Sequence, residues 1–161
     1  MKKSSIVFLQ AVIVLIGIVA LAIMIRFPLT EGRAANLDLF SIYADPFIIY
    51  GYLASIAFFV ALYQAFKLLG YIGQNKVFSL GSVKALRNIK YCASILSVLI
   101  VIAAIYIRAS FNGNADDDPA GFMAVSIVAT LISIVIATAA AVFEKTLQSA
   151  VDIKSENDLT V

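Results

Sequence analysis

Few side chains in this 161-residue chain are of the types that perform catalysis. The sequence contains no histidine and a single cysteine, Cys92. Without histidine, imidazole-based acid–base chemistry and catalytic triads are excluded. A single cysteine also excludes an intrachain disulfide and, with no histidine, a Cys/His zinc cluster. Cys92 is expected to be a small packing residue, and we expect no enzymatic activity, no catalytic residues and no bound cofactor.

The nearest approach to a metal site is the acidic triplet Asp116–Asp118. Consecutive carboxylates rarely converge on calcium without the alternating spacing of an EF-hand loop. We therefore predict a solvated loop in which Asp118 caps a helix beginning near Pro119. Asp45 and Pro46 repeat the same pattern, because Asp accepts from exposed N–H groups and Pro is tolerated at the first helical position.

Polar side chains within apolar stretches are the remaining candidates for a functional site. They are two amides and five hydroxyls: Gln10, Gln64, Ser94, Ser97, Ser126, Thr130 and Ser133. Bundle packing is the simpler interpretation, because amides and hydroxyls bond across helices in lipid and an unpaired amide there is costly. The alternative is a pathway for a polar solute. It lacks the ionisable residues that usually mark such routes.

Composition indicates that lipid surrounds most of the chain. Hydrophobic residues make up 62% of the sequence and charged residues 14%, whereas an ordinary soluble domain is nearer half apolar and a quarter charged. Four uncharged stretches are each long enough to cross a hydrocarbon core of about 30 Å as helices. They comprise residues 6–25, 47–66, 91–107 and 121–143. The net charge of +2 gives no reason to expect direct contact with nucleic acid.

A cleaved signal peptide is the alternative interpretation of the first stretch, because Lys2 and Lys3 precede it. Its 20 residues exceed the usual apolar region of about 7–15 residues in a signal peptide. We therefore expect a retained span. Pro28, just beyond it, is expected to break the helix.

The segment of residues 67–90 determines the predicted orientation. It contains five cations and no acid: Lys67, Lys76, Lys84, Arg87 and Lys90. With both termini in the cytoplasm, nine Lys and Arg residues lie inside and three outside, the bias that sets orientation. We predict an all-α four-helix bundle that forms a single domain over residues 1–161. It would be a multi-pass membrane protein with both termini in the cytoplasm.

The same cytoplasmic segment is predicted to contain a short interfacial helix that continues into the third span. Ser79 would cap it. Apolar residues recur along it every three positions, and basic residues recur at the same spacing one position later. Its cations are candidate contacts for anionic lipid or a protein partner: Lys76, Lys84, Arg87 and Lys90. Alternatively, they are an orientation signal only. Gly70 and Gly73 would mark the end of the preceding helix.

The tail, residues 144–161, is the other candidate for a partner contact. A helical extension is expected through Lys154, followed by a polar end. It is either a solvated terminus or a segment that docks another protein.

Several segments resemble the bacterial domain-of-unknown-function family 2975. They are residues 61–69 (ALYQAFKLL), 78–79 (FS), 82–92 (SVKALRNIKYC), 115–121 (ADDDPAG) and 153–161 (IKSENDLTV). The resemblance implies a small four-span inner-membrane protein, common in Firmicutes, of uncharacterised activity. It also implies a gene often found beside one for a small helix-turn-helix regulator. No catalytic residues come with the family, so none are carried over.

Two functions are consistent with these features. The first is a non-enzymatic membrane protein with a regulatory or sensing role that holds a cytoplasmic regulator through residues 67–90 and the tail. The second is a small transporter or exporter of a polar or amphipathic solute. Small multidrug exporters carry a glutamate in their first span, whereas this chain has Gln10 and no acid there. A homo-oligomer is compatible with either function.

Overall fold

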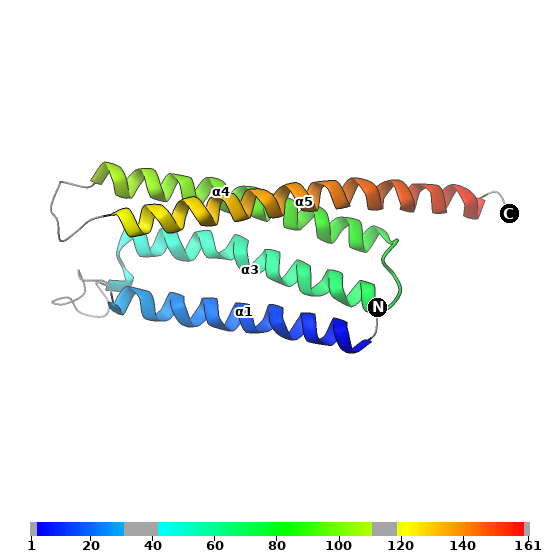
Figure 1. The fold of residues 1–161 in the computed structure, drawn as a ribbon, viewed down its shortest axis with the longest axis horizontal. Helices are drawn as coiled ribbons and strands as arrows, with labels where there is room; N and C mark the ends of the chain where they lie inside the picture. Colours follow the sequence, from blue (N-terminus) through cyan, green and yellow to red (C-terminus); the bar gives the residue numbers. More distant parts are fainter. Residues whose placement is uncertain (1–2, 31–41, 111–118, 160–161) are drawn as a thin grey trace. The chain divides into compact units, whose positions relative to one another are not determined.

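The computed structural model describes residues 3–30, 42–110 and 119–159, and the regular structure in these ranges is α-helical. The long helices are α1 (Lys3–Thr30), α3 (Pro46–Gly73), α4 (Leu80–Ser110) and α5 (Ala120–Leu159) (Figure 1). Each of the four is long and apolar enough to cross a membrane. The prediction of an all-α protein with four spans is therefore confirmed.

Every helix is longer than its predicted crossing. The shortest, α1 and α3, have 28 residues each, or about 42 Å at 1.5 Å per residue. The hydrocarbon core is about 30 Å thick. Each helix thus contains one of the predicted uncharged stretches and extends beyond it at one or both ends.

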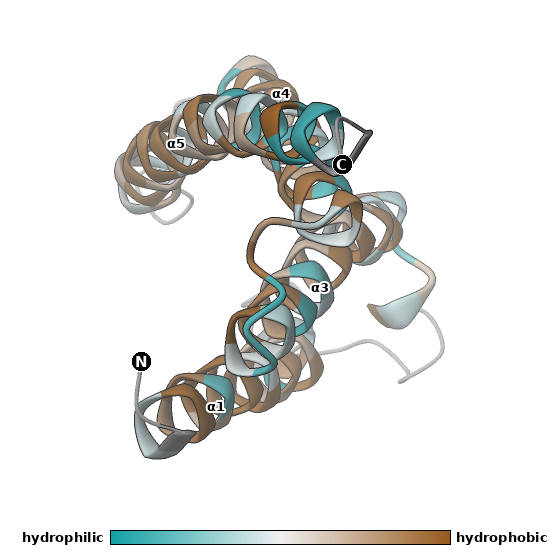
Figure 2. Ribbon diagram, turned by 90° about the vertical axis from the view of Figure 1, so that its right-hand side faces the viewer, coloured by the Kyte–Doolittle hydropathy of each residue, from teal (hydrophilic) through white to brown (hydrophobic). Residues whose placement is uncertain are grey.

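Apolar side chains remain exposed around these helices. Phe8 is 70% exposed on α1, and Val125 and Val135 are 69% and 66% exposed on α5. Figure 2 shows hydrophobic residues around the helices and the hydrophilic residues of α5 near its C-terminal end. Soluble monomers rarely expose apolar surface on this scale, so lipid is the solvent that fits these helices.

Two predicted helix starts are confirmed. The Asp45 side chain accepts from the backbone N–H of Phe47 at 2.7 Å and of Ile48 at 3.4 Å, with Pro46 as the first helical residue. The Ser79 hydroxyl accepts from the Ser82 N–H at 3.3 Å. The Asp118 cap lies outside the described residues.

One predicted helix end, that of α3, is confirmed, and the other, at Pro28, is wrong. Helix α3 ends at Gly73, as predicted. Pro28, in contrast, does not break α1, which continues through it to Thr30. A proline inside a helix has no N–H and therefore deprives the carbonyl four residues earlier, here that of Met24, of its donor.

Two tyrosines donate to carbonyls near Pro28. The Tyr52 hydroxyl on α3 donates to the Met24 carbonyl oxygen at 3.1 Å. The Tyr43 hydroxyl donates to the neighbouring Ile25 carbonyl oxygen, also at 3.1 Å. In lipid, a freed backbone group such as the Met24 carbonyl needs a partner, and the Tyr52 hydroxyl supplies one.

The helices form two compact units. Residues 1–77 contain α1 packed on α3, and residues 78–161 contain α4 packed on α5. In the second unit, α4 covers the predicted interfacial stretch and the third span without interruption. The surface location of its first turns, and the single domain over the whole chain, stay predictions.

Helix α5 likewise continues from the fourth crossing through the tail to Leu159. The expected helical extension is therefore present and is longer than predicted. Figure 1 shows the C-terminal end of α5 extending past the N-terminal end of α4.

Candidate functional site

One face of α5 is buried, and the last buried residue along it is the charged Glu144. The buried positions in its described part are Ser126, Ser133, Ala140 and Glu144. Spacings of seven, seven and four residues place them on one side of a helix. Small residues at three of these positions allow close approach to a neighbouring helix.

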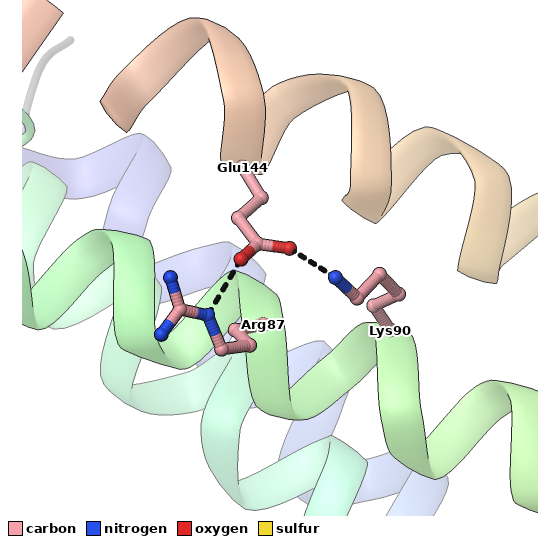
Figure 3. Close-up of polar contacts among 3 residues, drawn as sticks. All are labelled: Arg87, Lys90 and Glu144. Carbon is pink, nitrogen blue, oxygen red and sulfur yellow. Dashed lines mark hydrogen bonds and ion pairs between the residues drawn. The ribbon is translucent and has the colours of Figure 1, made fainter. Parts of the chain in front are cut away.

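Glu144 joins this face to the basic part of α4. Its Oε1 accepts from Arg87 Nε and its Oε2 from Lys90 Nζ, each at 2.6 Å (Figure 3). The two donors lie one turn apart on α4, so each carboxylate oxygen has its own cation. We call Arg87, Lys90 and Glu144 the Glu144 cluster.

The Glu144 carboxylate is buried and therefore needs its two cations. The Glu144 side chain is 10% exposed, whereas those of Arg87 and Lys90 are 50% and 26% exposed. An ionised carboxylate taken out of water is stable only when paired and hydrogen-bonded. The Lys90 ammonium also lies 4.8 Å from the Tyr91 ring centroid, a cation–π distance. The cluster has a net charge of +1.

The cluster lies at one end of two crossings. Glu144 directly follows the uncharged stretch 121–143, and Lys90 directly precedes the stretch 91–107. Because α4 and α5 run antiparallel, these two ends coincide. The cluster therefore marks the boundary between the uncharged and the charged parts of this helix pair.

Comparison with known proteins places the chain in a family. The family model described as "Protein of unknown function (DUF2975)" matches residues 28–161. The chain belongs to this family. The matched residues include the whole Glu144 cluster.

The chain is also 44% identical, over 165 residues, to the "Uncharacterized membrane protein YoaS" of Bacillus subtilis (strain 168). That similarity covers 100% of both chains. No solved structure matches. The DUF2975 resemblance predicted from sequence is thus confirmed, and the chain is a membrane protein of this family.

The sequence of this DUF2975 chain does not by itself reveal the role of Glu144, which the hydropathy pattern identifies only as the end of the fourth span. The spacing of small and hydroxyl residues does lead to Glu144 along one helix face. What it cannot supply is the partner, since Lys90 and Arg87 are 54 and 57 residues away. Of the four candidate lipid or partner cations, these two are paired with Glu144, and Lys76 and Lys84 are exposed.

The candidate amides and hydroxyls have varied surroundings. Gln10 Nε2 on α1 donates to the Phe66 carbonyl oxygen on α3 at 3.3 Å, an interhelical hydrogen bond of the expected kind. Gln64 is half-buried on α3. Ser133 and Ser97 instead donate to carbonyl oxygens of their own helices, each at 2.8 Å. These two hydroxyls pair within their helices rather than across them.

A mainly apolar groove lies between α4 and α5. Its volume is about 510 Å³, and the lining residues are Val101, Ala104, Ile105, Arg108, Ala109, Met123, Ser126, Ile127, Thr130 and Leu131. Two of the candidate residues, Ser126 and Thr130, are among them, but the lining surface is almost entirely apolar. Ser94 is exposed elsewhere on α4.

Metal-binding chemistry has no support in the described ranges. No three Cys, His, Asp or Glu side chains there are grouped so as to hold a metal ion. The acidic triplet at 116–118 lies outside the described residues. Cys92 is half-buried on α4, as a packing residue would be.

Proposed function

We propose that this DUF2975 protein is a non-enzymatic component of the bacterial cytoplasmic membrane that docks a cytoplasmic regulator on the end of α5. The observation that supports the proposal is the continuity of α5 from the fourth crossing to Leu159. A tail that continues as helix presents its side chains in a fixed order.

The part of α5 beyond Glu144 has dimensions and a surface that suit a protein partner. Residues 145–159 span about 22 Å as helix. Ile153 is 67% exposed among exposed charged residues, including Asp152 and Lys154. An apolar anchor flanked by charges of both signs suits a groove on another protein. The Glu144 cluster ties the root of this segment to α4.

The family resemblance suggests the class of partner. Because genes of the family often accompany that of a small helix-turn-helix regulator, we propose that such a DNA-binding protein is held at the membrane by α5. The membrane protein itself would not contact nucleic acid.

The test is co-purification from detergent-solubilised membranes with a tag at the N-terminus. Full-length protein should recover a small DNA-binding protein. Deletion of residues 149–161 should abolish recovery while leaving the Glu144 cluster intact. Ile153→Asp should weaken recovery, whereas Thr138→Ala, a change at an exposed position within the fourth crossing, should not. Recovery of the same partner by the truncated chain, or of no specific protein by the full chain, would count against the proposal.

Transport of an amphipathic solute is the second candidate. The groove between α4 and α5 favours it, because its almost entirely apolar lining suits the apolar part of such a solute. Uptake and resistance assays in a deletion strain, complemented with wild type or Thr130→Leu, test it. A phenotype restored only by wild type would support transport, and the absence of any phenotype across substrates would weaken it.

A further inference from the structure

Arg87 uses only part of its hydrogen-bonding capacity on Glu144. The ion pair is made through Nε alone, although a guanidinium has five N–H donors. In Figure 3 the dashed line from the Glu144 carboxylate ends on Nε, and neither terminal nitrogen of Arg87 carries one. The side chain is also 50% exposed. Its outer edge, the one that matches a phosphate in a two-pronged contact, is therefore accessible.

A second cation lies one turn away. Lys84 precedes Arg87 by three residues on α4 and is exposed, and residues with this spacing are neighbours on a helix surface. The negative charge of Glu144 is already matched by Lys90 at 2.6 Å. Arg87 and Lys84 together therefore leave excess positive charge on this part of α4.

The position of Lys84 and Arg87 along α4 indicates which anion they would contact. Lys90 directly precedes the uncharged stretch 91–107, and Arg87 lies about one turn further from it. If that stretch occupies the hydrocarbon core, Arg87 and Lys84 lie at the depth of the lipid headgroups. Phosphate is the abundant anion at that depth.

We propose that Arg87 and Lys84 bind the phosphate of an anionic phospholipid headgroup, with Glu144 positioning the Arg87 side chain. A soluble phosphate shares the chemistry, but the site adjoins two membrane crossings, which favours the lipid. This site is independent of any partner on α5, so either proposal can fail without the other.

Native mass spectrometry of the full-length protein in detergent tests the site. Wild type is titrated with short-chain phosphatidylglycerol, short-chain phosphatidylcholine and inorganic phosphate. We expect preferential binding of phosphatidylglycerol. Arg87→Gln and Lys84→Gln should each lower that affinity about fivefold, the value expected for one cation near an anionic headgroup. Arg87→Lys should also lower it, because it keeps the charge and loses the two-pronged edge.

Lys154→Gln is the matched control, since it removes an exposed cation from the far end of α5. It should bind phosphatidylglycerol as wild type does. If Arg87→Gln does not fold, Lys84→Gln decides, because Lys84 is not part of the Glu144 cluster. Unchanged affinity in Lys84→Gln, an equal loss in Lys154→Gln, or equally strong binding of inorganic phosphate would each overturn the proposal.

Discussion

At the scale of single residues, Pro28 and Tyr52 form a complementary pair between α1 and α3. Pro28 leaves the Met24 carbonyl without its helical N–H donor, and the Tyr52 hydroxyl supplies a replacement at 3.1 Å. The pair explains why a proline can lie inside a helix of this membrane protein. The contribution of the Tyr52 hydroxyl to the free energy of unfolding should therefore depend on Pro28.

That dependence gives a double-mutant prediction. Tyr52→Phe should reduce the free energy of unfolding by about 1 kcal/mol, the typical net value of one hydrogen bond. In a Pro28→Ala background the loss should be much smaller, because the substituted alanine restores an N–H opposite the Met24 carbonyl. Thermal unfolding of the four proteins in detergent measures the coupling. Tyr63→Phe, at an exposed position, is the control. An equal loss in both backgrounds would contradict the pairing.

Glu144 provides the second prediction at this scale. Glu144→Gln keeps the shape of the side chain but leaves one acceptor oxygen for two cations, so it should lower the unfolding temperature by roughly 5 °C. Glu156→Gln, the same change at an exposed position of α5, should have little effect. Circular dichroism during heating measures both. Similar unfolding temperatures for wild type and Glu144→Gln would show that the cluster adds little stability.

At the scale of helices, α5 is continuous, and the distribution of charged residues divides it into a crossing and a projecting end. Residues 121–143 are uncharged, whereas the described part beyond Glu144 carries charges of both signs. Ser149, on the projecting end, has its hydroxyl bonded to the Lys145 carbonyl oxygen at 3.1 Å. A change at this position tests the projecting end without touching the crossing.

We predict that Ser149→Pro unwinds this end of α5. Proline removes the backbone N–H and its ring clashes with the carbonyl of Lys145, a cost of about 3 kcal/mol in a helix interior. Trypsin should then cleave after Lys154 faster than in wild type, since cleavage requires an unwound backbone. Ser149→Ala, which keeps the helix, should be cleaved at the wild-type rate. Equal cleavage rates for the two variants would argue that the end is already frayed.

The sequence predicts these helices well wherever the cause is local. Asp45 before Pro46, Ser79 before Leu80 and the uncharged stretches each act within a few residues, and the structure agrees with all of them. The expectation for Pro28 is wrong because its effect depends on Tyr52, which lies 28 residues away from Met24. The Glu144 cluster escapes prediction for the same reason. A pairing between distant residues depends on the register of two helices, which the spacing within one helix does not give.

At the scale of the whole molecule, the orientation of the chain can be tested directly. A Cys92→Ala background allows single cysteines to be placed at Asn75, Ser110 or Ser155. With both termini in the cytoplasm, an impermeant maleimide should label only Ser110→Cys in intact cells, because lysine and arginine bias places the other two sites inside. Permeabilised cells should allow labelling of all three and serve as the accessibility control. Labelling of Ser155→Cys in intact cells would indicate that the C-terminal end lies outside, contrary to the predicted orientation.

The ion pairs of Glu144 also have a consequence for biosynthesis. The ribosome adds Arg87 and Lys90 more than fifty residues before it reaches Glu144, so α4 is synthesised before its carboxylate partner exists. In the predicted orientation, both cations would first hold this end of α4 on the cytoplasmic side and would later pair with α5. A nascent chain stopped before Glu144 would contain α4 without its carboxylate partner, and the ion pairs between α4 and α5 would form only after Glu144 has been added.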